Sequence, residues 1–183
     1  RGLDDAELLR GRYAAPGAEM GKVSFDRLVI ATGLRPRRLD LPGPAPTAAA
    51  GRHVLRTLED AARLRAQLSP GARVVVLGAG FIGCEVAATS RGLGCDVVCV
   101  AIDPYPMVRA LGPMLGAEMQ RRHEEQGVRF RLGVGIASCT GDGRVTGVVL
   151  SDGEILPADV VVEAISSHCN TEWLSGSGLD LTD

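Results

Sequence analysis

A glycine-rich turn carries the clearest chemical signal in this sequence. Residues Gly78-Ala79-Gly80-Phe81-Ile82-Gly83 follow a valine-rich run and open a stretch with helical periodicity. In this pattern the first glycine makes a tight turn, the second lets the backbone approach a pyrophosphate, and the third lets the helix pack closely on the strand. The N-terminus of the helix would present unpaired N–H groups to the phosphates. The pattern predicts a dinucleotide-binding turn, and a tight turn without a ligand is the alternative.

The residues that would select between NAD(H) and NADP(H) leave both cofactors open. An acidic residue at the end of the second strand, about 20 positions after the turn, commonly binds the ribose hydroxyls of NAD. Ala101 occupies that position, and the nearest acid is Asp103. No arginine stands at the end of the strand for the 2′-phosphate of NADP, although Arg109 follows Asp103 by six residues. We therefore take Asp103 and Arg109 as candidate binding residues.

The cysteines and histidines give no sign of a metal site or a redox pair. The five cysteines form no Cys-x-x-Cys pair, no Cys-x4-Cys pair and no cluster with histidine. Neither zinc nor a disulfide framework is therefore expected, and we interpret the cysteines as buried free thiols. His168 is interpreted as a surface residue rather than a catalytic one.

The periodicity around the turn predicts a βαβ unit. We expect strands at Arg73–Leu77 and Asp96–Ala101, with a helix over Phe81–Arg91 between them and a right-handed crossover. A second helix is expected over Leu111–Gln126, ended by Gly127, and a third parallel strand over Val128–Leu132. The buried sheet is therefore expected to be parallel.

The flanking segments differ in character from this unit. Arg27–Gly33 is typical of a buried parallel strand, and residues 34–51 contain four prolines that indicate a linker. Thr57 and Asp60 predict a capping box for a helix over 58–68. Turn signals at Gly141 and Ser151 separate three short runs typical of an antiparallel meander over one face: Ile136–Cys139, Val145–Leu150 and Glu154–Leu156. A last strand, Ala158–Glu163, is expected to rejoin the parallel sheet.

Composition narrows the class of protein. The 183 residues are 45% hydrophobic and 3% aromatic, with 24 Gly and 10 Pro, as in a turn-rich α/β chain of one domain or one domain with part of another. A net charge of -2 with interspersed signs predicts no nucleic-acid or membrane partner. The short apolar runs and charged N-terminus favour a soluble cytoplasmic protein. Because the chain opens at Arg1 rather than Met, we interpret it as a fragment.

Three blocks together resemble a known family. Asp26–Gly33, His53–Ala61 and Val74–Ala88 are similar, in order and spacing, to consecutive blocks of FAD-dependent pyridine nucleotide-disulfide oxidoreductases of the ferredoxin and rubredoxin reductase type. The resemblance runs from about Val23 to the end of the chain. It implies an α/β fold with a Rossmann-like parallel sheet, helices on both faces, an antiparallel three-stranded meander and flanking pieces of an FAD domain. The domains implied are 1–51 (end of the FAD domain and linker), 52–165 (NAD(P)-binding domain) and 166–183 (return toward the FAD domain).

The resemblance also assigns residues and chemistry. It places Thr32, Gly33 and Arg56 on the flavin side, and Gly78, Gly80, Gly83 and Glu85 on the NAD side. Glu85 would lie near the nicotinamide, the alternative being a carboxylate favoured by the helix dipole. The implied reaction passes a hydride from NAD(P)H to FAD, and then single electrons to a ferredoxin-like or rubredoxin-like acceptor. The present chain alone is expected to bind the dinucleotide without catalysing the reaction.

Two departures from the family pattern keep other readings open. Ala101 replaces the strand-end glutamate typical of NADH-using members, and the family's Gly-Ile-Gly-x-x-Pro-Asn stretch is here Ala164-Ile-Ser-Ser-His-Cys-Asn170. Ser166 stands where a glycine lets the backbone approach the nicotinamide, and Cys169 where a proline stiffens the turn. A degenerate Rossmann module with a regulatory or interaction role is therefore the first alternative. A methyltransferase that uses the same turn for another nucleotide is the second.

Overall fold

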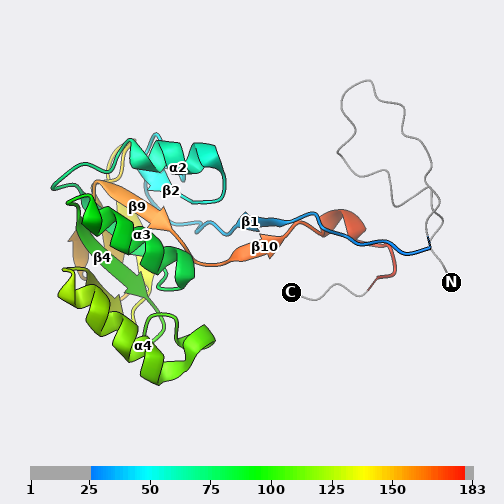
Figure 1. Cartoon of the computed structure of the whole chain (residues 1–183). Coiled ribbons are helices and arrows are strands. Elements are labelled where there is room, and N and C mark those ends of the chain that lie inside the picture. The colour runs from blue at the N-terminus through cyan, green and yellow to red at the C-terminus, as the bar shows by residue number, and fades with distance from the viewer. Residues whose placement is uncertain (1–25, 180–183) are drawn as a thin grey trace. The chain divides into compact units, whose positions relative to one another are not determined.

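Valine-rich strands form a five-stranded parallel sheet. The computed structural model describes residues 26–179. The chain divides into unit 1, Arg1–Arg35 with His168–Asp183, and unit 2, Pro36–Ser167. The parallel sheet belongs to unit 2 (Figure 1), and its strands lie in the order β2 (Arg52–His53), β9 (Val160–Glu163), β3 (Arg73–Leu77), β4 (Asp96–Ala101) and β5 (Arg129–Leu132).

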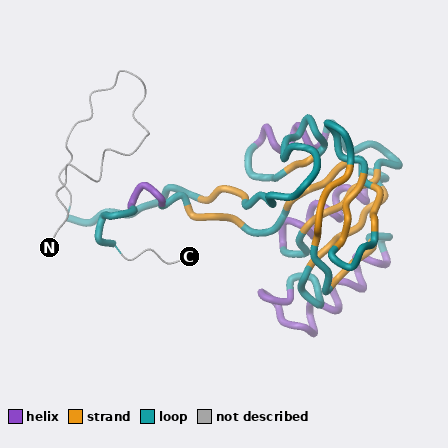
Figure 2. The backbone as a smooth tube through the Cα atoms, turned by 180° about the vertical axis from the view of Figure 1, so that it is seen from behind, coloured by secondary structure: helices purple, strands orange, loops and turns teal. Residues whose placement is uncertain are grey.

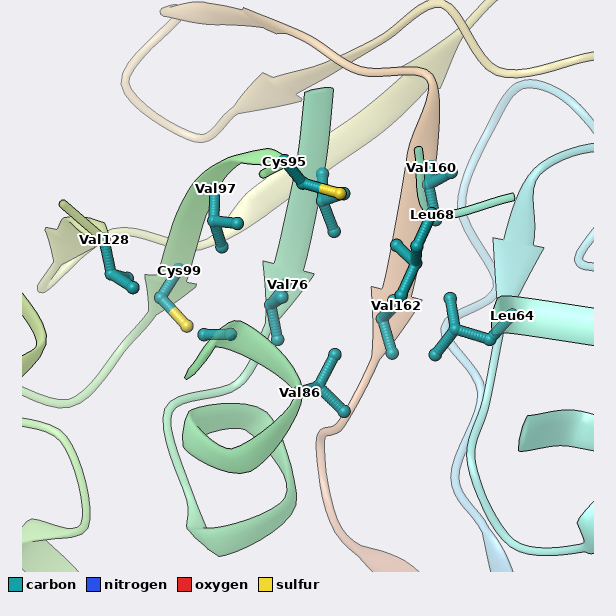
Figure 3. Close-up of a cluster of buried hydrophobic side chains, with 12 residues drawn as sticks. Leu64, Leu68, Val76, Val86, Cys95, Val97, Cys99, Val128, Val160 and Val162 are labelled. Carbon is teal, nitrogen blue, oxygen red and sulfur yellow. The ribbon is translucent and has the colours of Figure 1, made fainter. Parts of the chain in front are cut away.

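Alternation along β3 gives the sheet two apolar faces. Val74 and Val76 belong to the cluster that includes Val86 of α3 (Phe81–Gly92), which Figure 3 shows beneath the strands. Val75 and Leu77 belong to a second cluster on the other face. Both faces of the sheet are therefore buried at its centre, which explains why β3 and β4 are apolar after their first residue.

Helices cover one face and a meander covers the other. The helical face carries α2 (Leu58–Arg65), α3 and α4 (Val108–Glu125), and α4 is held there by the edge-to-face packing of His123 on Phe130 of β5. The opposite face carries the antiparallel strands β6 (Ile136–Thr140), β7 (Gly147–Leu150) and β8 (Ile155–Pro157), which lie in front of the helices in Figure 2. The expected fold class is confirmed, except that the described helices lie on one face only, because the meander occupies the other.

Most element boundaries follow the sequence pattern, and the deviations have local causes. β3 and β4 have the expected bounds. Helix α2 begins with the expected capping box of Thr57 and Asp60 but ends at Arg65 rather than at residue 68. Within α4, Gly112 is non-helical (φ 76°) just before Pro113. The regular part of this helix therefore begins at Pro113, a residue favoured at the first helical position.

Unit 1 departs furthest from expectation. Its strands β1 (Leu34–Pro36) and β10 (Ser167–Cys169) form a two-stranded sheet, followed by the 3-10 helix η1 (Glu172–Leu174). The strand expected over Arg27–Gly33 is wrong, because these residues form no strand and Val29 is 86% exposed. An apolar run becomes a strand only when a neighbour pairs with it, and no described strand lies beside this one.

The proline-rich segment expected as a linker packs on unit 2. Leu39 and Leu41 lie against the cluster beneath the meander, and Ala50 is 4% exposed. The first and last residues of the chain, 1–25 and 180–183, are outside the described residues, and with them parts of the segments expected on the flavin side. Between residues 26 and 179 there is no helix with the length and apolar character needed to span a bilayer.

A buried ion pair fastens the proline-rich segment to the sheet. The Arg52 guanidinium donates to Oε1 of Glu163 from Nε (3.0 Å) and Nη2 (2.8 Å), and both side chains are essentially inaccessible. Arg52 also donates to the carbonyl groups of Pro44 and Leu39, and Oε2 of Glu163 accepts from the Leu39 amide at 2.8 Å. The pair thus joins β2, the end of β9 and the segment around Leu39.

Replacing Arg52 by Met should lower the free energy of unfolding by about 3 to 5 kcal/mol, because the variant leaves a buried carboxylate without its cation. The matched control is Arg73→Met, which breaks the exposed pair with Asp159 and should cost less than about 1 kcal/mol. Urea unfolding at neutral pH measures both. The double variant Arg52→Met with Glu163→Met should recover part of the loss. Equal costs for the two single variants would show that the buried pair is not an anchor.

Candidate functional site

The turn after β3 lies where the order of the sheet reverses. From β3 the chain continues to β4 and β5 on one side, and β9 later adds on the other side. In open parallel sheets, ligands bind at the carboxyl ends of the strands at such a reversal. The glycine-rich turn Gly78–Gly83 therefore occupies the position at which this architecture forms a crevice.

Two of the three glycines are required by the protein itself. Gly78 has φ 101°, and a Cβ there would lie 2.4 Å from the carbonyl oxygen of Ala164. At Gly83 a Cβ would lie 1.9 Å from the carbonyl oxygen of Gly78. Both positions must therefore lack a side chain so that α3 and the segment after β9 can approach the turn.

Gly80 has no such internal requirement. Its backbone is extended (φ -79°), which any residue adopts, and a Cβ there would have no heavy atom within 4 Å. Gly80 is also the N-cap of α3 and supplies no side-chain cap. No side chain therefore caps the first N–H groups of the helix, and the space beside Gly80 is open.

The other residues of the turn differ in exposure. Ala79 is 7% exposed, whereas Phe81 and Ile82 are 56% and 49% exposed. Exposed apolar side chains on the first turn of a helix do not serve the core. Phe81 and Ile82 therefore add apolar surface next to Gly80 in the chain.

The loop after β4 is held against this turn by backbone hydrogen bonds. The Met107 amide donates to the Ala79 carbonyl at 2.8 Å, and the Gly78 amide donates to the Val100 carbonyl at 2.8 Å. Met107 has a left-handed backbone conformation, with φ 54°. The loop carries Asp103, and α4 begins directly after it with Arg109 in its first turn. The two side chains form an ion pair in which Nε of Arg109 lies 3.0 Å from Oδ2 of Asp103. Ala101, at the end of β4, is 8% exposed.

The segment after β9 forms the other side of the crevice. The Ala164 amide donates to the Leu77 carbonyl at 2.7 Å, so this segment continues beside the turn. Ser166 has φ 93°, a conformation that favours glycine. Its carbonyl accepts from the Arg37 amide at 3.0 Å, which holds the strained backbone in place.

The remaining candidates lie at different places. Glu85 is exposed in the first half of α3, and Arg56 is exposed just before α2, where its amide donates to Asp60. Thr32 and Gly33 belong to unit 1, where the Thr32 hydroxyl donates to the Asn170 carbonyl at 2.7 Å and the Asn170 amide donates to the Gly33 carbonyl. The structure thus groups the glycine-rich turn, Asp103, Arg109 and Ser166 on unit 2.

Cys84 lies in the first turn of α3 and is buried. A helix N-terminus normally favours a thiolate, but burial acts in the opposite direction and raises the pKa of the Cys84 thiol to about 11. The thiol lies 3.6 Å from the Ala79 carbonyl as a weak donor. Cys84 is therefore protonated at neutral pH and acts as a packing residue. Across residues 26–179, His, Cys, Asp and Glu side chains form no group of three that could hold a metal ion.

Sequence reasoning missed two contributors to this region. No pattern indicated the left-handed Met107, because methionine rarely adopts that conformation. The Arg52–Glu163 pair did leave a signal, since a glutamate at the end of the buried strand Val160–Glu163 needs a cationic partner.

Comparisons with known proteins show the family of this chain. The family model described as pyridine nucleotide-disulphide oxidoreductase matches residues 7–183. The chain is 42% identical to a probable ferredoxin reductase, CtmF, of Castellaniella defragrans, over 89% of this chain and 39% of that protein. It is 43% identical to the ferredoxin–NAD(+) reductase component of a p-cumate 2,3-dioxygenase system of Pseudomonas putida, over 88% of this chain and 38% of that protein.

Solved structures show the same likeness. The reductase in a covalent putidaredoxin reductase–putidaredoxin complex superposes with a TM-score of 0.81 at 37% identity, over 87% of this chain and 39% of that one. A ferredoxin reductase for the CYP199A2 system from Rhodopseudomonas palustris superposes with a TM-score of 0.76 at 40% identity, over 83% and 37%. The chain thus spans about two fifths of the length of these relatives.

Alanine substitutions should distinguish Gly83, which packing requires to lack a side chain, from Gly80, where a Cβ has open space. Gly83→Ala should lower the free energy of unfolding by about 1 to 3 kcal/mol or more, because its methyl group would collide with the Gly78 carbonyl. Gly80→Ala should cost no more than about 1 kcal/mol, because it loses only the preference for glycine over alanine at an N-cap. Thermal or urea unfolding of both variants checks this. A large destabilisation by Gly80→Ala would mean that its space is not open.

Proposed function

Since this chain belongs to the pyridine nucleotide-disulphide oxidoreductase family, we propose that unit 2 binds NAD(H) or NADP(H) with the pyrophosphate over the turn Gly78–Gly83. The observation that carries the proposal is the open position at Gly80. The protein's own packing accounts for Gly78 and Gly83 but not for Gly80. A ligand that approaches the backbone there gives a reason for a third glycine.

The two ends of the dinucleotide would meet different elements. The adenosine end would lie toward Asp103 in the loop after β4 and Arg109 at the start of α4, because that loop is joined to the turn through Met107 and Ala79. The nicotinamide end would lie toward Ser166 after β9, with Glu85 on the near part of α3. Ser166 keeps the positive φ expected of a glycine, which supports a nicotinamide site whose backbone shape is preserved.

For the whole protein we propose the activity that its relatives' names describe, a ferredoxin–NAD(+) reductase. Bound NAD(P)H would supply a hydride to FAD, and the flavin would release electrons singly to a ferredoxin-like acceptor. Thr32, Gly33 and Arg56 are proposed on the flavin side. In this scheme the residues of unit 2 bind and orient the nicotinamide, and the chemistry needs the parts of the protein that carry the flavin.

The second candidate is a degenerate nucleotide module with a regulatory or interaction role. Ala101 favours the degenerate module, because alanine has only a methyl group at the strand end where a carboxylate commonly binds the ribose of NAD. Direct titration separates the two, since a degenerate module binds neither NADH nor NADPH.

Gly80→Val should abolish dinucleotide binding and leave the fold intact. Its branched side chain would fill the space at the N-terminus of α3 and displace the pyrophosphate. Isothermal calorimetry with NADH and NADPH should show binding to the unmodified chain and at least a hundredfold loss in the variant. A matched control is Gly71→Val, at a glycine remote from the turn where a Cβ also has open space. Because φ is 81° there, the variant should lose some stability, yet it should keep the affinity.

Two results would count against the proposal. Failure of the unmodified chain to bind either dinucleotide would favour the degenerate module. Unchanged affinity in a folded Gly80→Val variant would place the ligand elsewhere. Circular dichroism of the variants establishes that each is folded before titration.

A further inference from the structure

The Asp103–Arg109 ion pair deepens the proposed function, on which this inference rests. We infer that the pair cancels the charge that would discriminate at the adenosine ribose, so that the site binds NADH and NADPH with similar affinity. Asp103 alone would favour NADH, and Arg109 alone would favour NADPH. Joined to each other, they leave neither preference dominant.

The pair is placed where the ribose would lie. Asp103 follows Ala101, the last residue of β4, by two positions, and β4 is the direct neighbour of β3 in the sheet. The loop is fixed at both ends, since the Gly133 amide donates to the Asp103 carbonyl at 3.2 Å and the Met107 amide donates to the Ala79 carbonyl. Ala101 itself contributes no charge and no hydrogen-bonding side chain.

The Asp103–Arg109 pair is bidentate, with two guanidinium nitrogens on the two carboxylate oxygens. Nε of Arg109 lies 3.2 Å from Oδ1 and 3.0 Å from Oδ2 of Asp103, and Nη2 lies 3.1 Å from Oδ1. The guanidinium therefore uses one edge on the carboxylate. The Arg109 side chain is 74% exposed and that of Asp103 is 35% exposed, so both groups remain accessible to a ligand.

Opposite charges act oppositely on the two cofactors. A carboxylate accepts hydrogen bonds from the ribose hydroxyls of NADH but repels the 2′-phosphate of NADPH, whereas a guanidinium attracts that phosphate. Because the two groups are in direct contact, a phosphate meets both at similar range and their effects largely cancel. Removal of either member should expose the preference of the other.

A purely structural role predicts something different. If the pair only fastened the loop after β4, then loss of either residue would weaken NADH and NADPH together. The ratio of the two dissociation constants separates these roles, because a loosened loop changes both constants and leaves the ratio in place.

The experiment measures dissociation constants of NADH and NADPH by calorimetry for the 183-residue chain and three variants. For the unmodified chain the two constants should agree within about tenfold. Asp103→Asn should shift the ratio at least tenfold toward NADPH, and Arg109→Gln at least tenfold toward NADH, each shift equivalent to about 1.4 kcal/mol. The control Arg121→Gln, which removes an arginine from an ion pair further along α4, should leave the ratio unchanged.

Each other outcome overturns the inference in a recognisable way. A selectivity above a hundredfold in the unmodified chain, or parallel shifts of both constants in the variants, would refute the cancelling pair while dinucleotide binding stands. Absence of binding to either cofactor would remove the proposed function and the inference together. If Asp103→Asn proved unfolded by circular dichroism, Asp103→Ser would take its place with the same expected shift.

Discussion

The close approach of α3 to the end of β3 is the constraint from which the rest of unit 2 follows. Gly83 lies so near the Gly78 carbonyl that a Cβ would come within 1.9 Å of it. At that distance Val86 and Ala87 of the helix reach the apolar cluster around Val76 (Figure 3). The same approach points the start of the helix at the carboxyl edge of the sheet. The packing of the core and the position of the open space at Gly80 therefore both follow from one backbone contact.

Backbone contacts also assemble the remainder of the candidate site. The hydrogen bond from Met107 to Ala79 fixes the loop after β4, and the bond from Gly78 to Val100 joins the turn to β4 itself. The bond from Ala164 to Leu77 fixes the segment after β9. None of them depends on a side chain. The side chains present at Ala101 and Ser166 therefore do not decide whether these bonds form. Ser166 even keeps a positive φ at a cost of order 1 to 3 kcal/mol, because its surroundings determine the backbone.

Sequence reasoning succeeded where the cause of structure is local. β3 and β4 have the expected bounds because each begins at a charged residue, Arg73 or Asp96, and runs through residues buried on both faces. The glycine-rich turn was recognisable because its spacing has a mechanical reason. β2 was missed, since Arg52 is buried only because Glu163, 111 residues away, lies beside it. Asp103 and Arg109 were named singly, but their pairing depends on a loop whose shape includes the left-handed Met107.

The order of the strands explains how one turn can serve both ends of a long cofactor. β3 lies between β9 and β4, and neighbouring strands are about 4.8 Å apart. The segments that follow β9 and β4 are thus about 10 Å from each other, with the glycine-rich turn in the middle. In the proposed mode of binding, a dinucleotide with its pyrophosphate at the turn would extend toward both. Binding strength would then come mainly from backbone N–H groups of α3, and selectivity from the few side chains at either end. Such a division allows residues like Ala101, Asp103 and Arg109 to change the preferred cofactor while the fold that presents them stays the same.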